Sequence, residues 1–105
     1  MLIDVSVTLM NLEGETLKKS DKPFRLKDAC CDALLGMYPD EQQLAGTEKY
    51  ERFELARKIM KNDQVDLSAE EIAKCKAMIG KAFGTNVVGP AFDALATTIA
   101  PVASI

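Results

Sequence analysis

The segment KNDQVDLSAEEIAKC, residues 61–75, brings several acidic side chains close together, and Leu67 precedes Glu71 by four residues. This arrangement is found in the second half of a calcium-binding helix–loop–helix, where a bidentate glutamate closes the loop. Residues 61–75 could therefore form a metal site, or they could form only a capped turn between two helices.

The ligand positions decide against calcium. If Glu71 is the bidentate glutamate, earlier ligand positions fall on Met60, Asn62 and Gln64, and Val65 takes the place of the turn glycine. A methionine cannot ligate a hard cation such as calcium, and valine resists the sharp turn that glycine makes. The other register puts Ala69 at the glutamate position, so the sequence predicts no calcium site.

The same residues fit a helix start. Ser68 and Glu71 have the S-x-x-E spacing of a capping box, in which each side chain binds the other residue's backbone N–H. Glu70 and Glu71 lie at the positive end of the helix dipole, where carboxylates are favoured. The sequence therefore predicts a helix that begins after Ser68, with Leu67 and Val65 entering the core.

The remaining chemistry is limited by residue types. The chain has no histidine, which excludes Ser-His-Asp and Cys-His catalysis and a haem histidine. Cys30, Cys31 and Cys75 are too few for a closed structural zinc site. Asp28 and Asp32 flank Cys31 and disfavour its thiolate. We therefore assign no catalytic, metal or cofactor-binding residue, and we expect a protein that is not an enzyme and carries no cofactor.

Composition bounds the class of protein. The 105 residues are 48% hydrophobic and 28% charged, as in a single globular domain. A net charge of −3 argues against binding nucleic acid through phosphates. No run of about 18 apolar residues suggests a membrane span. The first residues lack a basic signal region, so we expect a cytoplasmic protein.

Hydrophobic periodicity predicts the elements. Period-two alternation of Ile3, Val5, Val7 and Leu9 indicates a strand, and a turn at Gly14 would return it as a β-hairpin over residues 2–18. Four amphipathic segments with helical spacing follow. Their apolar stripes are Leu26, Ala29, Cys30, Ala33, Leu34 and Met37; Phe53, Ala56, Ile59 and Met60; Ile72, Cys75, Ile79 and Phe83; and Val88, Ala91, Phe92, Leu95 and Ile99.

Capping signals mark the second and fourth helices. Thr47 is the expected N-cap of the second, and Pro90 is expected in the first turn of the fourth. The fold class is therefore α+β: an N-terminal β-hairpin packed on a bundle of about four short helices. The organisation is one domain, 1–105, with the hairpin in 1–20, the helical part in 24–99 and a tail in 100–105.

A partner interface is the remaining site. Leu35, Tyr38, Leu44 and Tyr50 are apolar or aromatic residues that the helical stripes leave over. They could form a contact patch around the 36–50 loop, because tyrosine is enriched at interfaces, or they could simply cover the ends of the bundle. The exposed edge of the hairpin is a second route to a partner, including another copy of the chain.

The layout VTLMNLEGETLK, PFRLKDACCDALLG, GTEKYERFELARKIMKNDQVDLSAEEIAKCKAMIGKAF and VVGPAFDAL resembles that of small proteins encoded by phages and prophages. The resemblance implies an accessory role and supplies no active-site residues. We expect a non-enzymatic module that binds and modulates a host or phage protein. A factor or chaperone for tail or head assembly is the second possibility, and a small enzyme or ligand sensor is the third.

Overall fold

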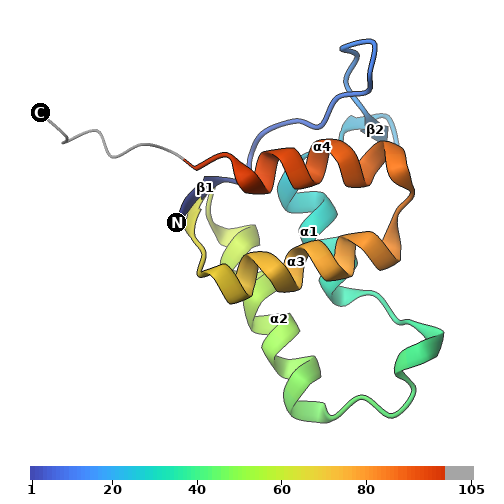
Figure 1. The fold of residues 1–105 in the computed structure, drawn as a ribbon, viewed down its shortest axis with the longest axis vertical. Helices are drawn as coiled ribbons and strands as arrows, with labels where there is room; N and C mark the ends of the chain where they lie inside the picture. The colour runs from blue at the N-terminus through green and yellow to red at the C-terminus, as the bar shows by residue number, and fades with distance from the viewer. Residues whose placement is uncertain (99–105) are drawn as a thin grey trace, which may run out of the picture.

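A computed structural model describes residues 1–98 of the chain and shows short strands packed on helices (Figure 1). In chain order, the elements are β1 (Leu2–Asp4), β2 (Lys18–Lys19), β3 (Lys22–Pro23), α1 (Leu26–Leu35), the 3-10 helix η1 (Pro39–Glu41), α2 (Gly46–Lys61), β4 (Gln64–Asp66), α3 (Ala69–Ala82) and α4 (Thr85–Ala96). Four helices with an N-terminal antiparallel hairpin confirm the predicted α+β class. Ile99 and the tail 100–105 lie outside the described residues.

The N-terminal hairpin differs in detail from the expected one. Strands β2 and β3 pair across Ser20 and Asp21, whose φ angles of 52° and 64° give the doubly left-handed turn that suits a two-residue hairpin. The predicted turn at Gly14 also forms, with φ 81°. Beyond it, the Leu17 N–H donates to the Leu9 carbonyl at 2.9 Å.

The first strand has a different partner from the expected one. Strand β1 pairs antiparallel with β4, so Ile3 lies opposite Val65, and both side chains are buried. The Leu67 N–H extends this pairing by donating to the Met1 carbonyl at 2.8 Å. Strand β1 therefore ties the start of the chain to the junction between α2 and α3.

That junction contains the predicted capping box. The Glu71 N–H donates to Ser68 Oγ at 3.1 Å, and the Ser68 N–H donates to Glu71 Oε1 at 2.9 Å. Leu67 is completely buried just before the cap. Residues 61–75 are thus a helix end, a strand and a capped helix start.

The buried face of α2 is rotated from the predicted stripe. Ala56 and Ile59 of the predicted stripe are buried, but Phe53 and Met60 are each 47% exposed, and the flanking Leu55 is buried instead. The buried face also includes Arg52, which is 7% exposed. The helix begins one residue before the expected cap Thr47, with Ala45 at the N-cap position.

The other helices supply the rest of the core. Helix α1 packs against both α2 and α3, and α4 packs against α3 and β1; α3 and α4 run side by side (Figure 1). Helix α1 ends at Leu35, so Met37 lies beyond it and is 97% exposed, contrary to the predicted stripe. Pro90 lies inside α4 and not in its first turn. The segment from the end of α1 to the start of α2 therefore lies at the edge of the bundle.

Candidate partner-binding groove

Three of the four predicted interface residues line one hollow. Leu35, Tyr38 and Leu44 surround a space of about 600 Å3 between the end of α1, the loop that contains η1, and α2. Leu35 is 56% exposed, and Tyr38 is half-buried. The fourth residue, Tyr50, lies apart from them, exposed beside a separate hollow between α2 and α3.

Tyr38 holds the loop against the end of α1. Its hydroxyl donates to the Ala33 carbonyl at 2.5 Å, and Lys81 lies over its ring at 5.5 Å. Gly36 leaves room for this contact, because a Cβ there would lie 3.0 Å from the tyrosine oxygen. The tyrosine thus anchors the chain where it turns away from α1.

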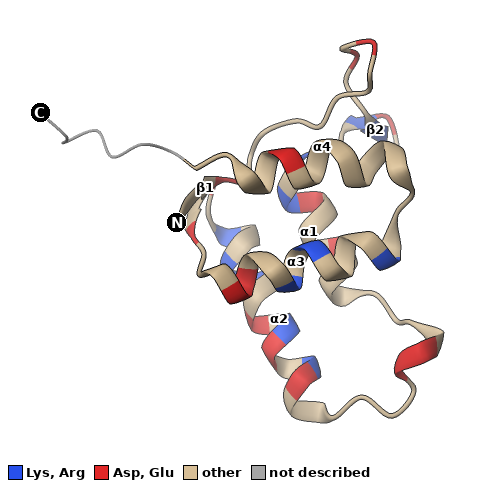
Figure 2. Ribbon diagram, in the orientation of Figure 1, with Lys and Arg blue, Asp and Glu red and all other residues tan. Residues whose placement is uncertain are grey.

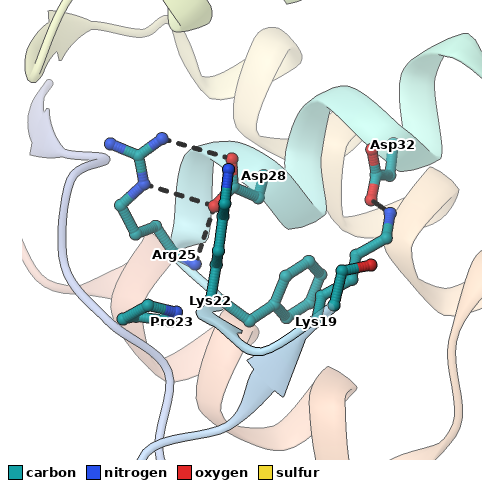
Figure 3. Close-up of a pocket in the computed structure, with 8 residues that line it drawn as sticks. Lys19, Lys22, Pro23, Arg25, Asp28 and Asp32 are labelled. Carbon is teal, nitrogen blue, oxygen red and sulfur yellow. Dashed lines mark hydrogen bonds and ion pairs between the residues drawn. The ribbon is translucent and has the colours of Figure 1, made fainter.

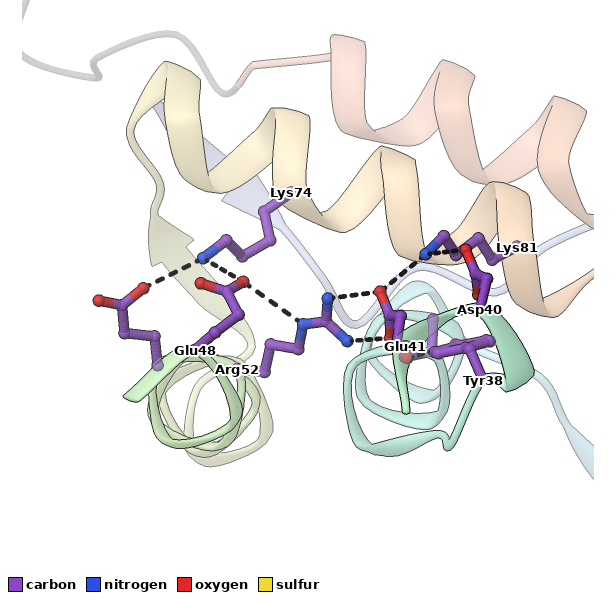
Figure 4. Close-up of polar contacts among 9 residues, drawn as sticks. Tyr38, Asp40, Glu41, Glu48, Arg52, Lys74 and Lys81 are labelled. Atoms are coloured by element: carbon purple, nitrogen blue, oxygen red, sulfur yellow. Dashed lines mark hydrogen bonds and ion pairs between the residues drawn. The ribbon is translucent and has the colours of Figure 1, made fainter. Parts of the chain in front are cut away.

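A network of ion pairs fixes the same loop to α2 and α3 (Figure 4). Arg52 donates two hydrogen bonds to the Glu41 carboxylate, at 2.7 and 2.8 Å. Lys81 of α3 binds Glu41 at 2.7 Å and Asp40 at 3.1 Å. Bidentate arginine–carboxylate pairs are the stronger and more directional kind, so the loop has a defined position.

The network extends along α2 towards α3. Arg52 Nε lies 3.4 Å from Glu48 Oε1, an ion pair without hydrogen-bond geometry, and Lys74 binds the same oxygen at 3.1 Å. Hydrogen bonds from Arg52, and then from Lys81, lower the pKa of Glu41 to about 2. Glu41 is therefore ionised throughout the physiological pH range, and its negative charge is neutralised by Arg52 and Lys81 within the fold.

A second hollow of about 330 Å3 adjoins the first and shares Leu35 and Phe53 with it. Cys31, Ala56 and Met60 also line this second space, and the Arg57 guanidinium stacks 4.8 Å from the Phe53 ring centre. We call the two hollows together the α1–α2 groove. Its exposed large apolar side chains are Leu35, Met37, Phe53 and Met60.

Hydrophobic periodicity does not identify Phe53 and Met60 as groove residues, because it predicts both in the core. The signal that could have found them is Leu55, which flanks the predicted stripe and is spaced i,i+4 from Ile59. A buried face that includes Leu55 also includes Arg52, and hydrophobic periodicity disfavours a buried arginine. The bidentate contact with Glu41 compensates the buried guanidinium, and Glu41 lies in a loop that periodicity does not address.

The cysteines lie in the core. Cys31 is 3% exposed, and its thiol lies 3.4 Å from the Ala56 carbonyl, which accepts from it. Burial, and then the nearby carboxylates of Asp28 and Asp32, raise the pKa of Cys31 to about 11. The thiol therefore stays protonated near neutral pH, when it is a poor nucleophile.

A further hollow of about 530 Å3 lies beside the hairpin (Figure 3). Its charges are mostly satisfied within the fold: Arg25 Nε lies 3.2 Å from Asp28 Oδ2, and Lys19 pairs with Asp32. Within residues 1–98, no group of three or more Cys, Asp or Glu residues is placed to hold a metal ion. The described helices include none with the length and apolar character needed to cross a membrane.

Comparisons of the chain with protein-family models, with curated proteins and with solved structures found no match. The α1–α2 groove is therefore the candidate functional site.

Proposed function

We propose that this protein is a non-enzymatic protein-interaction module, of the phage-encoded kind that its sequence resembles, and that a protein partner binds in the α1–α2 groove. One observation carries the proposal: Leu35, Met37, Phe53 and Met60 are exposed together around two adjoining hollows. Contiguous exposed apolar surface of this kind marks interaction sites in soluble proteins.

The rigidity of the groove supports the proposal. The contacts of Glu41 with Arg52 and Lys81 and the hydrogen bond from Tyr38 to Ala33 hold the loop before binding. A surface that is already ordered loses less conformational entropy when a partner binds.

The hairpin edge is the weaker route. Strands β2 and β3 have two residues each, and three of those four residues are lysines. Short, lysine-rich edge strands are a feature that discourages pairing with another chain. The α1–α2 groove is therefore the better candidate for the contact surface.

The test is comparative capture from bacterial lysate, with and without phage infection, using wild type, Phe53→Asp and Leu12→Asp. Both positions are exposed, but Leu12 lies just before the turn at Gly14 and lines neither hollow of the α1–α2 groove. We expect at least one protein to be retained by wild type and by Leu12→Asp but lost with Phe53→Asp.

Thermal melts would show that both variants remain folded. The proposal fails if no captured protein separates Phe53→Asp from Leu12→Asp. The identity of a captured protein would distinguish a host target from a virion component.

A further inference from the structure

The groove face of α2 carries cations between its apolar side chains. Lys49, Phe53, Arg57 and Lys61 follow one another at i,i+4 spacing, so they lie along one side of the helix. Met60 lies on the same side, seven residues after Phe53. The floor of the groove is thus apolar, and its rim on α2 is basic.

Two of these cations have no ion-pair partner among residues 1–98. Arg57 pairs with Glu54, but Lys49 and Lys61 form an ion pair with none of the carboxylates in residues 1–98. Glu41 is the acidic residue that lines the groove, and Arg52 and Lys81 occupy its oxygens.

This excess of positive charge is local. The chain as a whole has a net charge of −3, and acidic and basic residues are interleaved along α2 (Figure 2). The groove face differs from that average, because Lys49 lines the larger hollow and Lys61 lines the smaller one. A partner segment that carries carboxylates at both ends would meet both ammonium groups.

We propose, on the basis of the function proposed above, that the segment that binds in the α1–α2 groove is an acidic amphipathic helix. Its apolar stripe would contact Leu35, Phe53 and Met60, and its flanking carboxylates would face Lys49 and Lys61. Phe53 and Met60 are separated by about 10 Å along α2. That is the spacing of apolar anchors at i and i+7 on a docked helix.

Charge also argues against a second copy of this chain in the groove. A two-fold interface brings the same patch of two copies together. Lys49, Arg57 and Lys61 of each copy would then face those of the other, whereas Glu54, which pairs with Arg57, lines the separate hollow between α2 and α3. Like charges brought together across an interface are unfavourable, so the groove suits a different, acidic partner.

The test uses two synthetic helical peptides with the same leucine stripe at i, i+3, i+4 and i+7. One has glutamate at the flanking positions, and the other has lysine at the same positions. Binding is measured by fluorescence anisotropy at low and high salt. We expect the acidic peptide to bind about tenfold more tightly than the basic one, with the difference reduced by salt.

Matched charge variants test the site. Lys49→Glu combined with Lys61→Glu should weaken binding of the acidic peptide about tenfold. Lys18→Glu combined with Lys22→Glu on the hairpin changes the net charge equally and should leave affinity nearly unchanged. Circular dichroism would check folding, and the milder pair Lys49→Gln and Lys61→Gln provides a second set of variants.

Several outcomes would overturn the proposal: neither peptide binds, the two bind equally, or the groove and hairpin charge variants behave alike. If Phe53→Asp abolishes binding but the variants of Lys49 and Lys61 leave it unchanged, the groove remains the binding site, but its occupant is not an acidic helix. If sedimentation shows a dimer that Phe53→Asp dissociates, the occupant is a second copy. Failure of the proposed function would be detected separately, by a capture experiment in which no protein distinguishes Phe53→Asp from Leu12→Asp.

Discussion

Ile59→Ala is expected to lower the free energy of unfolding by about 2–5 kcal/mol, the usual cost of truncating a buried aliphatic side chain to alanine. The neighbouring change Met60→Ala should lower it by less than about 1 kcal/mol, because removing a partly exposed side chain leaves little cavity. Ile59 is fully buried between the helices, whereas Met60 is 47% exposed in the α1–α2 groove. Urea denaturation followed by circular dichroism measures both values.

A second pair of variants checks the same rotation of α2 one to two turns earlier. Leu55→Ala should be strongly destabilising, because Leu55 is 5% exposed, and Phe53→Ala should be much milder. If Met60→Ala and Phe53→Ala cost as much as Ile59→Ala and Leu55→Ala, α2 instead buries the stripe predicted from periodicity. The groove would then lack its floor.

Glu41→Gln is expected to lower the melting temperature by several degrees at pH 7, because it leaves the buried Arg52 guanidinium without its bidentate carboxylate. The effect depends on pH. The pKa of Glu41 is about 2 in the folded protein, below the ordinary value of 4.5, so ionised Glu41 stabilises the fold above about pH 4.5. That contribution is lost as the pH falls from there towards 2.

The measurement is a series of thermal melts from pH 7 to pH 2.5. The difference in melting temperature between wild type and Glu41→Gln should be largest at pH 7 and should decrease as the pH falls. Asp40→Asn is the matched control, because Asp40 is exposed and pairs with only Lys81 within the described residues 1–98, and it should have little effect. A difference in melting temperature that stays constant down to pH 2.5 would contradict the assigned role of the Glu41 carboxylate.

Local signals in the sequence predicted much of the fold. Ser68 and Glu71 form a capping box because both partners lie within one helical turn, and the turn at Gly14 depends on one left-handed residue. The pairing of β1 with β4 could not be predicted in this way. Ile3 and Val65 are distant in sequence, and a local pattern does not show which strand lies beside which.

The candidate site shows the same limit. Leu35, Tyr38 and Leu44 come together because they lie close in sequence, around the loop between α1 and α2. Periodicity predicts Phe53 in the core, because a helical stripe does not by itself show which arc of the helix faces inward. The deciding contact joins Arg52 to Glu41, eleven residues apart across an irregular loop. Tyr50 lies outside the groove because α2 directs it towards α3.

Site-specific photocrosslinking in lysate tests most directly whether a protein partner contacts the α1–α2 groove. A photoreactive benzoylphenylalanine is placed at Met60 or, as the control, at Met10, which is equally exposed at 49% against 47%. We expect a discrete adduct from position 60, suppressed by excess unmodified protein, and no such adduct from position 10. A competable adduct from position 10 alone, or from neither position, would contradict the claim.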